Sequence, residues 1–302
     1  MFDLAEILRG VGVARFSVCR ADDVDDEADA LYRDWISEGR HGAMDYLERY
    51  PDVRRSPRRL LEGARSIVCC AFPYYTKLEK EPLFARYALG DDYHSVIRRR
   101  LSKAAEAIRE AYGGETRICV DTAPLRERYW AERSGLGTVG RNNCLIVPGL
   151  GSYVFLGEIL TTAELTATMA GERSSCGDCG ACERACPTGA LKNGRVDARK
   201  CLSYLTIEYR GDFGVDTDLY GRLYGCDRCQ SVCPHNCGLQ STDIEEFKPR
   251  EELLALTPAD VLEMAPEEYS RLFRNSAVKR ARLALLQRNA RRLTGLDSGN
   301  DK

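Results

Sequence analysis

The sequence contains no long apolar run. A transmembrane helix needs about 20 consecutive apolar residues, and no stretch of the 302 residues approaches that length. The first ten residues also lack the basic-then-apolar order of a secretory signal. Both absences argue against a membrane or secreted protein, so we expect a cytoplasmic one. With 44% hydrophobic residues the chain can still bury a sizeable core, and its length suggests two domains.

Acidic residues are missing from one stretch near the C-terminus. No Asp or Glu lies between Tyr269 and Leu296, although the net charge of the whole chain is only −2. Such a basic segment indicates contact with a polyanion, while a plain solvated helix face is an equally good interpretation. The basic residues of this segment are Arg271, Arg274, Lys279, Arg280, Arg282, Arg288, Arg291 and Arg292.

Cysteine, by contrast, is abundant, with 14 residues that include two dense motifs. The first motif has the Cys-x2-Cys-x2-Cys-x3-Cys-Pro spacing of bacterial ferredoxins, and the second repeats its closing half. A tight loop supplies only three of the four thiolates of a 4Fe-4S cubane, and the cysteine before proline ligates the other cluster. We therefore predict that one 4Fe-4S cluster is bound by Cys176, Cys179, Cys182 and Cys233.

A second 4Fe-4S cluster follows from the remaining cysteines. It would take Cys186, Cys226 and Cys229, and its fourth ligand is Cys201, with Cys237 as the competitor. Cys201 is preferred because it opens an apolar run that could pack under the cluster. Structural zinc does not explain the ferredoxin spacing, and a chain of this length needs no disulfide frame.

The hydrophobic pattern predicts a mixed α/β domain at residues 1–170, a ferredoxin-like two-cluster domain at 171–240 and a short basic helical region at 241–302. The polar stretch 169–175 is the expected junction. The apolar run 65–72 is predicted to form a buried strand, in which Cys69 and Cys70 are small core residues. The other predicted elements are helices at 2–9, 26–39, about 94–112, 124–133, 250–256, 258–264 and 276–293, a strand at 117–121, and a hairpin of 144–147 with 152–160.

Two clusters fused to so large an α/β domain imply a redox site in that domain. Asp121, at the end of a short strand, is the acid that we single out, and Arg128 on the following helix could face the same cleft. Their plain alternatives are a capping aspartate and a surface salt bridge. The glycines at 135, 137 and 140 precede a strand instead of opening a helix, which argues against a dinucleotide fingerprint.

Several long motifs, all in one order, resemble the epoxyqueuosine reductase family. The resemblance covers nearly all of residues 1–293. Its motifs are His41-Gly42-x-Met44, Ala85-Arg86-Tyr87-Ala88-Leu89-Gly90, Val120-Asp121-Thr122-Ala123-Pro124, Gly135-Leu136-Gly137, Gly151-Ser152-Tyr153-Val154-Phe155-Leu156-Gly157-Glu158-Ile159, the run from Cys201 to Glu208, and Tyr224-Gly225-Cys226-Asp227.

This resemblance implies an enzyme that uses cobalamin and two 4Fe-4S clusters to reduce epoxyqueuosine to queuosine. The substrate would be the wobble nucleoside of a tRNA with a GUN anticodon, and an external low-potential donor would supply electrons to a monomeric enzyme. The family's catalytic acid falls on Asp121 and its active-site arginine on Arg128. We expect desolvation to raise the pKa of Asp121, which would keep its proton available.

Cobalamin contacts are also carried over from the family. They fall on Asp121, Leu145, Leu156, Ser203 and Asp227. The Asp-x-His-x-x-Gly motif of many cobalamin proteins is absent, so we expect base-off binding without a histidine ligand. Longer relatives continue into a helical repeat domain that helps to hold tRNA. In this chain, tRNA affinity would rest on the basic C-terminal helix and on Arg54, Arg55, Arg58 and Arg59.

Two other functions compete with this interpretation. A reductive dehalogenase shares the cobalamin and two-cluster plan, but such enzymes usually carry a twin-arginine export signal, which the N-terminus lacks. An electron-transfer subunit without catalysis would need neither Asp121 nor so large a first domain.

Overall fold

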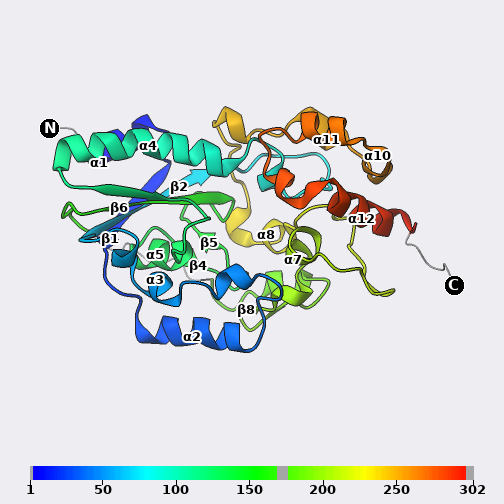
Figure 1. The fold of residues 1–302 in the computed structure, drawn as a ribbon, viewed down its shortest axis with the longest axis horizontal. Coiled ribbons are helices and arrows are strands. Elements are labelled where there is room, and N and C mark those ends of the chain that lie inside the picture. Colours follow the sequence, from blue (N-terminus) through cyan, green and yellow to red (C-terminus); the bar gives the residue numbers. More distant parts are fainter. Residues whose placement is uncertain (1–2, 169–175, 297–302) are drawn as a thin grey trace.

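The computed structural model describes residues 3–168 and 176–296. A four-stranded antiparallel sheet with the strand order β1-β2-β6-β3 forms the centre of the N-terminal half (Figure 1). The strands of this sheet are β1 (Arg15–Arg20), β2 (Ser66–Pro73), β3 (Thr116–Cys119) and β6 (Val154–Thr161).

Strand β2 is the continuous apolar run of the sequence, and it pairs with β1 on one side and β6 on the other. A strand that is covered on both faces needs apolar side chains at every position, which is why no polar alternation is seen. Cys69 and Cys70 are fully buried in it. Their prediction as small core residues is confirmed.

Helices cover both faces of the sheet (Figure 1). On one face lie α1 (Leu4–Gly10) and the long α4 (Tyr93–Tyr112), whose apolar stripe packs on the sheet. On the other face lie α2 (Asp26–Ser37), α3 (Pro51–Arg55) and α5 (Glu127–Arg133). The sheet therefore places the C-terminal end of β3 between the start of α4 and the start of α5.

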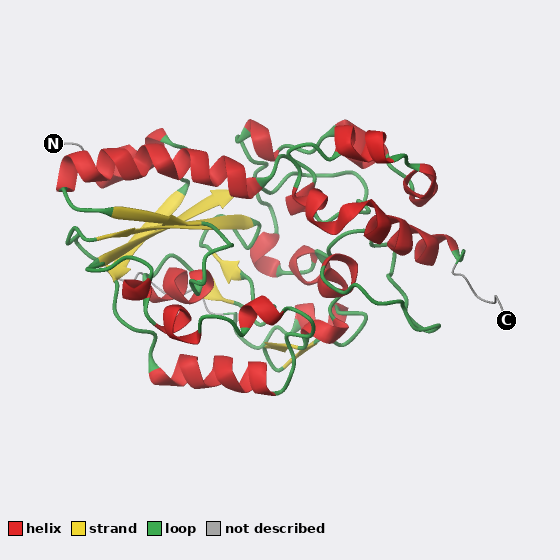
Figure 2. Ribbon diagram, viewed as in Figure 1, coloured by secondary structure: helices red, strands yellow, loops and turns green. Residues whose placement is uncertain are grey.

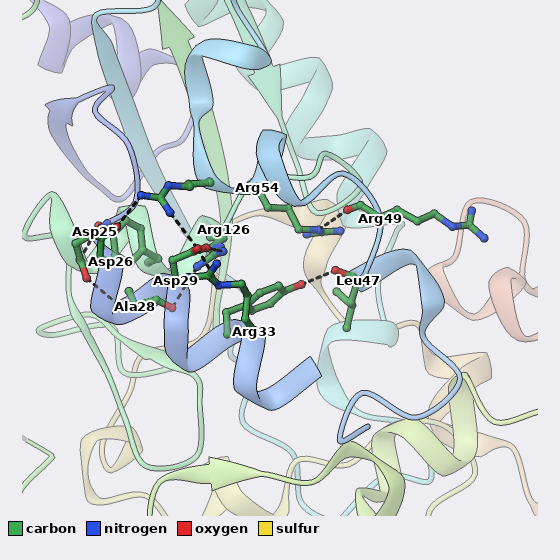
Figure 3. Close-up of polar contacts among 12 residues, drawn as sticks. Asp25, Asp26, Ala28, Asp29, Arg33, Leu47, Arg49, Arg54 and Arg126 are labelled. Atoms are coloured by element: carbon green, nitrogen blue, oxygen red, sulfur yellow. Dashed lines mark hydrogen bonds and ion pairs between the residues drawn. The ribbon is translucent and has the colours of Figure 1, made fainter. Parts of the chain in front are cut away.

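A buried ion network fastens α2 to the residue that precedes α5 (Figure 3). Asp29 is only 5% exposed and accepts hydrogen bonds from Arg126 and Arg55, while Arg33 lies 3.2 Å away. The Arg126 guanidinium also lies 4.4 Å from the ring centroid of Tyr32. A buried carboxylate needs such partners, and the network fixes where α5 begins.

The cysteine-rich segment consists of short elements joined by turns (Figure 2). The predicted junction 169–175 lies outside the described residues. The two-residue strands β4 and β5 lie before the segment and form a sheet of their own, as do β7 and β8 within it. The elements are β4 (Thr138–Val139), β5 (Leu145–Ile146), α6 (Ala181–Ala185), β7 (Leu191–Lys192), β8 (Arg195–Val196), α7 (Leu202–Ile207) and α8 (Arg228–Ser231).

The C-terminal helices pack against this segment and form a second core with Phe84 and Tyr224. None of the helices in the described ranges has the length and apolar character that crossing a bilayer requires. The helices are α9 (Glu251–Ala255), α10 (Pro258–Glu263), α11 (Pro266–Leu272) and α12 (Arg282–Thr294). Short 3₁₀ turns complete the structure: Asp45–Leu47, Pro57–Arg59, Arg86–Ala88, Ala198–Lys200, Pro234–Asn236, Glu245–Phe247 and Ala277–Ala281.

Three expected elements differ from the structure. The hairpin of 144–147 with 152–160 is wrong, because β5 pairs with β4 while β6 inserts between β2 and β3. The helix expected from Pro124 begins only at Glu127, after the network of Arg126. The helix 276–293 is divided into a 3₁₀ turn and α12 at Arg282, whose φ of 61° is left-handed.

Candidate active site

A cavity of about 310 Å³ opens between the α/β sheet and the cysteine-rich segment. One side, which we call the carboxylate wall, consists of Tyr93, His94 and Asp121. The opposite side, which we call the cysteine wall, includes Cys201 and Ser203 from the start of α7. An ionisable group and a candidate cluster ligand therefore line the same space, which we call the Asp121 cavity.

Asp121 is held by His94, which stands at the start of α4. The Nε2 atom of His94 lies 2.9 Å from Oδ2 of Asp121, and its Nδ1 atom lies 2.7 Å from Oδ1 of Asp92. Asp121 itself has a left-handed φ of 54° and follows β3. This turn directs its carboxylate toward α4, and His94 is clamped between two carboxylates.

The charges of this triad are set by hydrogen bonding. Burial lowers the pKa of His94, but its hydrogen bonds to Asp121 and Asp92 outweigh this and raise the pKa to about 9. Burial raises the pKa of Asp121, but the hydrogen bond and charge of His94, with the charge of Arg280, bring it below its ordinary value. The expected upward shift at Asp121 is therefore wrong. At neutral pH the proton of the pair rests mainly on His94.

Arg280 is a cavity residue that the sequence pattern did not single out as such. It lines the Asp121 cavity from the 3₁₀ turn before α12, donates to Glu208 over 2.8 Å and lies 5.6 Å from the ring centroid of Tyr46. His94 is a second cavity residue that the sequence pattern did not single out. Its spacing from Asp92 and its place at a helix start were the available signals.

Several predicted site residues lie elsewhere. Arg128 does not line the Asp121 cavity, and its guanidinium donates to the backbone carbonyl of Asn143. Leu145 is buried on β5, and Leu156 packs on the same apolar cluster from β6. Neither leucine lines the cavity. These three assignments stay predictions.

Ser203 and Asp227 lie beside the cluster cysteines. Ser203 lines the cavity, and its hydroxyl accepts a hydrogen bond of 3.2 Å from the backbone N–H of Cys226. Asp227 is 2% exposed and accepts a hydrogen bond of 2.6 Å from the backbone N–H of Arg86. Burial raises the pKa of Asp227. The two residues thus connect the second cysteine motif to both the cavity and the α/β half.

The cysteines of the first predicted cluster influence one another. Burial and then, among other contacts, the charge of Cys176 raise the pKa of Cys182. Burial and then the charges of Cys176 and Cys179 likewise raise the pKa of Cys233. Cys233 thus lies with the first motif although it belongs to the second in sequence. The backbone N–H of Arg141 also donates to Cys176 Sγ over 3.5 Å.

The other cysteines form a second group around Cys201. Burial raises the pKa of Cys201, and the charge of Cys186 adds to this shift. The thiol of Cys229 donates a hydrogen bond to Cys144, and this bond, burial, and the charges of Cys144, Cys201 and Cys226 raise the pKa of Cys229. Cys237, the competing ligand, is exposed. In the described ranges no three His, Cys, Asp or Glu side chains are spaced to hold a single metal ion.

Many of the basic residues expected to meet a polyanion have partners within the chain. Arg288 donates to the carbonyls of Leu205, Tyr209 and Gly211, and Arg292 donates to those of Val215 and Thr217. The expectation that the whole basic helix faces a polyanion is therefore wrong for these two.

The N-terminal basic group is also partly used within the chain. Arg54 donates to the carbonyl of Arg49 (Figure 3) and also to that of Tyr46. Arg55 pairs with Asp26 and Arg58 with Asp22. These pairs are exposed, so the arginines still present positive charge to solvent.

Comparison with known proteins identifies the family. Residues 54–122 match the family model described as "Epoxyqueuosine reductase QueG, DUF1730", and residues 175–236 match a "4Fe-4S double cluster binding domain". The chain is 39% identical over 280 residues to the epoxyqueuosine reductase of Leadbetterella byssophila, covering 90% of this chain and 91% of the relative. The chain belongs to the epoxyqueuosine reductase family. It is also 37% identical to the Escherichia coli enzyme, covering 84% of this chain and 70% of the relative.

Solved structures of the family share the fold. A crystal structure of epoxyqueuosine reductase with an epoxyqueuosine-modified tRNA-Tyr stem loop superposes with a TM-score of 0.85 at 31% identity, covering 95% of this chain and 78% of the other. The Streptococcus thermophilus enzyme gives a TM-score of 0.85 at 29% identity, covering 97% and 80%. The chain is accordingly an oxidoreductase with a double 4Fe-4S cluster domain.

Proposed function

We propose that this enzyme reduces epoxyqueuosine to queuosine in tRNA, in the cytoplasm and as a monomer. The observation that carries the proposal is the Asp121 cavity, where a proton-bearing pair faces a predicted cluster ligand within one chain. Removal of the epoxide oxygen consumes two electrons and two protons and releases water. Electrons from an external low-potential donor would enter through the clusters, and protons through the carboxylate wall.

The residues present fit the groups that the family uses. Eight cysteines in two sets supply the thiolates for two 4Fe-4S clusters: Cys176, Cys179, Cys182 and Cys233 for one, and Cys186, Cys201, Cys226 and Cys229 for the other. Cobalamin fits beside the second set, because the cavity has aromatic and apolar sides together with Ser203. When bound, it supplies the cobalt centre for reduction of the epoxide. No free imidazole faces it from the described cavity residues, since His94 is held at both nitrogens, in keeping with base-off binding.

Protonation of the leaving oxygen is the task of Asp121. An alkoxide is a poor leaving group, and a positioned acid typically contributes 10²–10⁴-fold to the rate. Because the resting proton lies on His94, we propose that His94 passes this proton through Asp121 to the oxygen. His94 is then left as a neutral imidazole whose remaining N–H is held by Asp92. A Bacillus subtilis relative is described with its catalytic loop swung out of the active site. We propose that Asp121 lies on the corresponding loop.

Recognition of tRNA would use exposed basic residues of the chain. Arg280 lies at the cavity itself, while Arg291 and Arg59 are exposed. Within the proposed division, residues 1–170 handle protons and cobalamin, 171–240 carry the clusters, and 241–302 support the cysteine wall and meet tRNA. Arg128 is proposed to act indirectly, through the loop of Asn143.

The decisive experiment is an anaerobic assay of reconstituted enzyme with cobalamin, a strong reductant and epoxyqueuosine-containing tRNA. Mass spectrometry of the nucleosides should show loss of the mass of one oxygen atom. A parallel reaction with unmodified tRNA controls for nonspecific reduction. Unchanged epoxyqueuosine, with clusters and cobalamin shown to be bound, would refute the proposed substrate and direct the search to halogenated compounds.

A further inference from the structure

A second pair of acids lies beneath the Asp121 cavity and has no part in the mechanism above. Glu158 stands in the middle of the central strand β6, opposite Cys69 of β2 and Cys119 of β3. It is 0% exposed. Glu127 is the first residue of α5, in the adjoining helix layer, and it interacts electrostatically with Glu158.

The contact between these acids requires a proton. Ionised carboxylates only accept hydrogen bonds, so two carboxyl groups can bond to each other only if one is protonated. Both oxygens of Glu158 are buried and meet no hydrogen-bond donor among the residues that the structure describes. Two like charges in a dry interior would repel strongly. Glu158, which lies deeper, is the member that keeps the proton.

The surroundings of the pair also favour a protonated Glu158. The thiols of Cys19, Cys69 and Cys119 lie on the same face of the sheet as Glu158, from three strands, and offer no positive charge. Arg128 is the cation near Glu127, and Asp121 is the nearest other anion. Burial and then Glu127 raise the pKa of Glu158 well above its ordinary value, while burial and then Asp121 raise that of Glu127 to about 7.

Glu127 connects this pair to the turn at Asp121 that follows β3. Its Oε1 atom accepts a hydrogen bond from the backbone N–H of Asp121, the residue with the left-handed φ. A left-handed aspartate needs support from its surroundings, since the conformation is uncommon for residues with a side chain. Arg126, the neighbour of Glu127, is fixed by Asp29. The acceptor for the Asp121 N–H is therefore anchored on both sides.

We propose that Glu158 donates its proton to Glu127, and that Glu127 in turn holds the backbone of Asp121 so that its carboxylate faces His94. Both acids are positioning residues, and their proposed effect on turnover rests on the proposed function. The pair itself is a property of the protein and exists without substrate, clusters or cobalamin. Its state can therefore be measured independently of activity.

The first test is the infrared spectrum of the enzyme at neutral pH. The difference between wild type and Glu158→Gln should contain the carbonyl band of one protonated carboxylic acid, while the other buried acids, Asp29 and Asp227, cancel. Glu106→Gln, an exposed change on α4, is the matched control and should give no such band. Absence of the band from the wild type minus Glu158→Gln spectrum would overturn the proposal.

The second test is hydrogen exchange of the peptide containing Asp121. Glu127→Ala removes the acceptor and should speed exchange of the Asp121 amide, whereas Glu127→Gln keeps an acceptor oxygen and should restore protection. In the assay, Glu127→Ala should lower kcat by about 10–100-fold with KM for tRNA unchanged, because a displaced acid costs rate and not binding. Equal protection in Glu127→Ala and wild type would refute the positioning role, and it would do so even if the substrate proposed above were wrong.

Discussion

The two walls of the Asp121 cavity differ in whether protein groups alone provide a partner for each ionisable side chain. On the carboxylate wall each charged group has a partner: His94 lies between Asp92 and Asp121, and the N–H of Asp121 is bound by Glu127. On and behind the cysteine wall the thiols of Cys201, Cys226 and Cys229 crowd one another. Burial raises the pKa of Cys201 and Cys226, and a hydrogen bond to Cys144 together with burial raises that of Cys229. Proton handling is therefore preassembled by protein groups, whereas electron handling requires the clusters to complete the wall.

The largest expected effect comes from breaking the carboxylate wall at Asp121. Asp121→Asn keeps the shape but cannot pass a proton, so turnover should fall about 10²–10⁴-fold. Iron content and tRNA affinity should stay normal, because the cysteine wall is untouched. Steady-state kinetics with iron analysis checks this. The exposed Asp23→Asn is the control, and turnover within twofold of wild type in Asp121→Asn would remove Asp121 from the mechanism.

The corresponding change on the cysteine wall is Cys201→Ala. Removal of one thiolate from the second set should cost one of the two clusters, so about half of the iron and of the cluster absorbance should be lost. Cys237→Ala is the matched control, because that thiol is exposed and was the competing ligand. If the control loses the iron instead, the fourth ligand has been assigned to the wrong cysteine.

A smaller effect is expected from the support behind the cysteine wall. Arg288 donates to the carbonyl of Leu205 on α7 and lies 4.0 Å from the ring centroid of Phe213. Arg288→Met should lower the stability of the enzyme by about 2 kcal/mol, because charged hydrogen bonds to backbone carbonyls are lost. Arg291→Met on the exposed face is the control, and a thermal melt compares the two. Equal melting temperatures would show that Arg288 is not a structural residue.

The pH dependence of the stability of the enzyme should reveal the ion pair of the carboxylate wall. The folded pKa of His94, about 9, lies above the ordinary value of 6.5, so its stabilisation is full below about pH 6.5 and is lost as the pH rises through 9. The pKa of Asp121 is lowered, so its share disappears as the pH falls below 3.8. The difference in melting temperature between wild type and His94→Asn should shrink from pH 6.5 to 9. A difference that is constant with pH would contradict the ion pair.

The smallest effect concerns tRNA. Arg291→Gln on the exposed face of α12 should flatten the dependence of log K on log salt by roughly 0.7–0.9, which is one phosphate contact. Filter binding across a salt series measures this slope. An unchanged slope would mean that this face of α12 does not touch the tRNA backbone.

The sequence by itself determined the cysteine motifs, the two-cluster domain and the family, because ligand spacing and long motifs are local properties of the chain. It also marked Asp121, since an acid at the end of a strand is visible in the hydrophobic pattern. The buried strand with Cys69 and Cys70 was predictable for the same reason. Where a residue's environment depends only on its neighbours in sequence, the sequence pattern was sufficient to predict that environment.

The tertiary structure alone decided which groups meet Asp121. His94, Arg280 and Glu127 come from three separate elements, and only the packing of α4, α5 and the C-terminal turn brings them together. The pairing of β6 with β2 and β3 could not be predicted from turn signals either, since β4 and β5 compete for the same neighbours in sequence. The pKa of Asp121 fell instead of rising because partner charges, which sequence spacing does not reveal, outweigh desolvation.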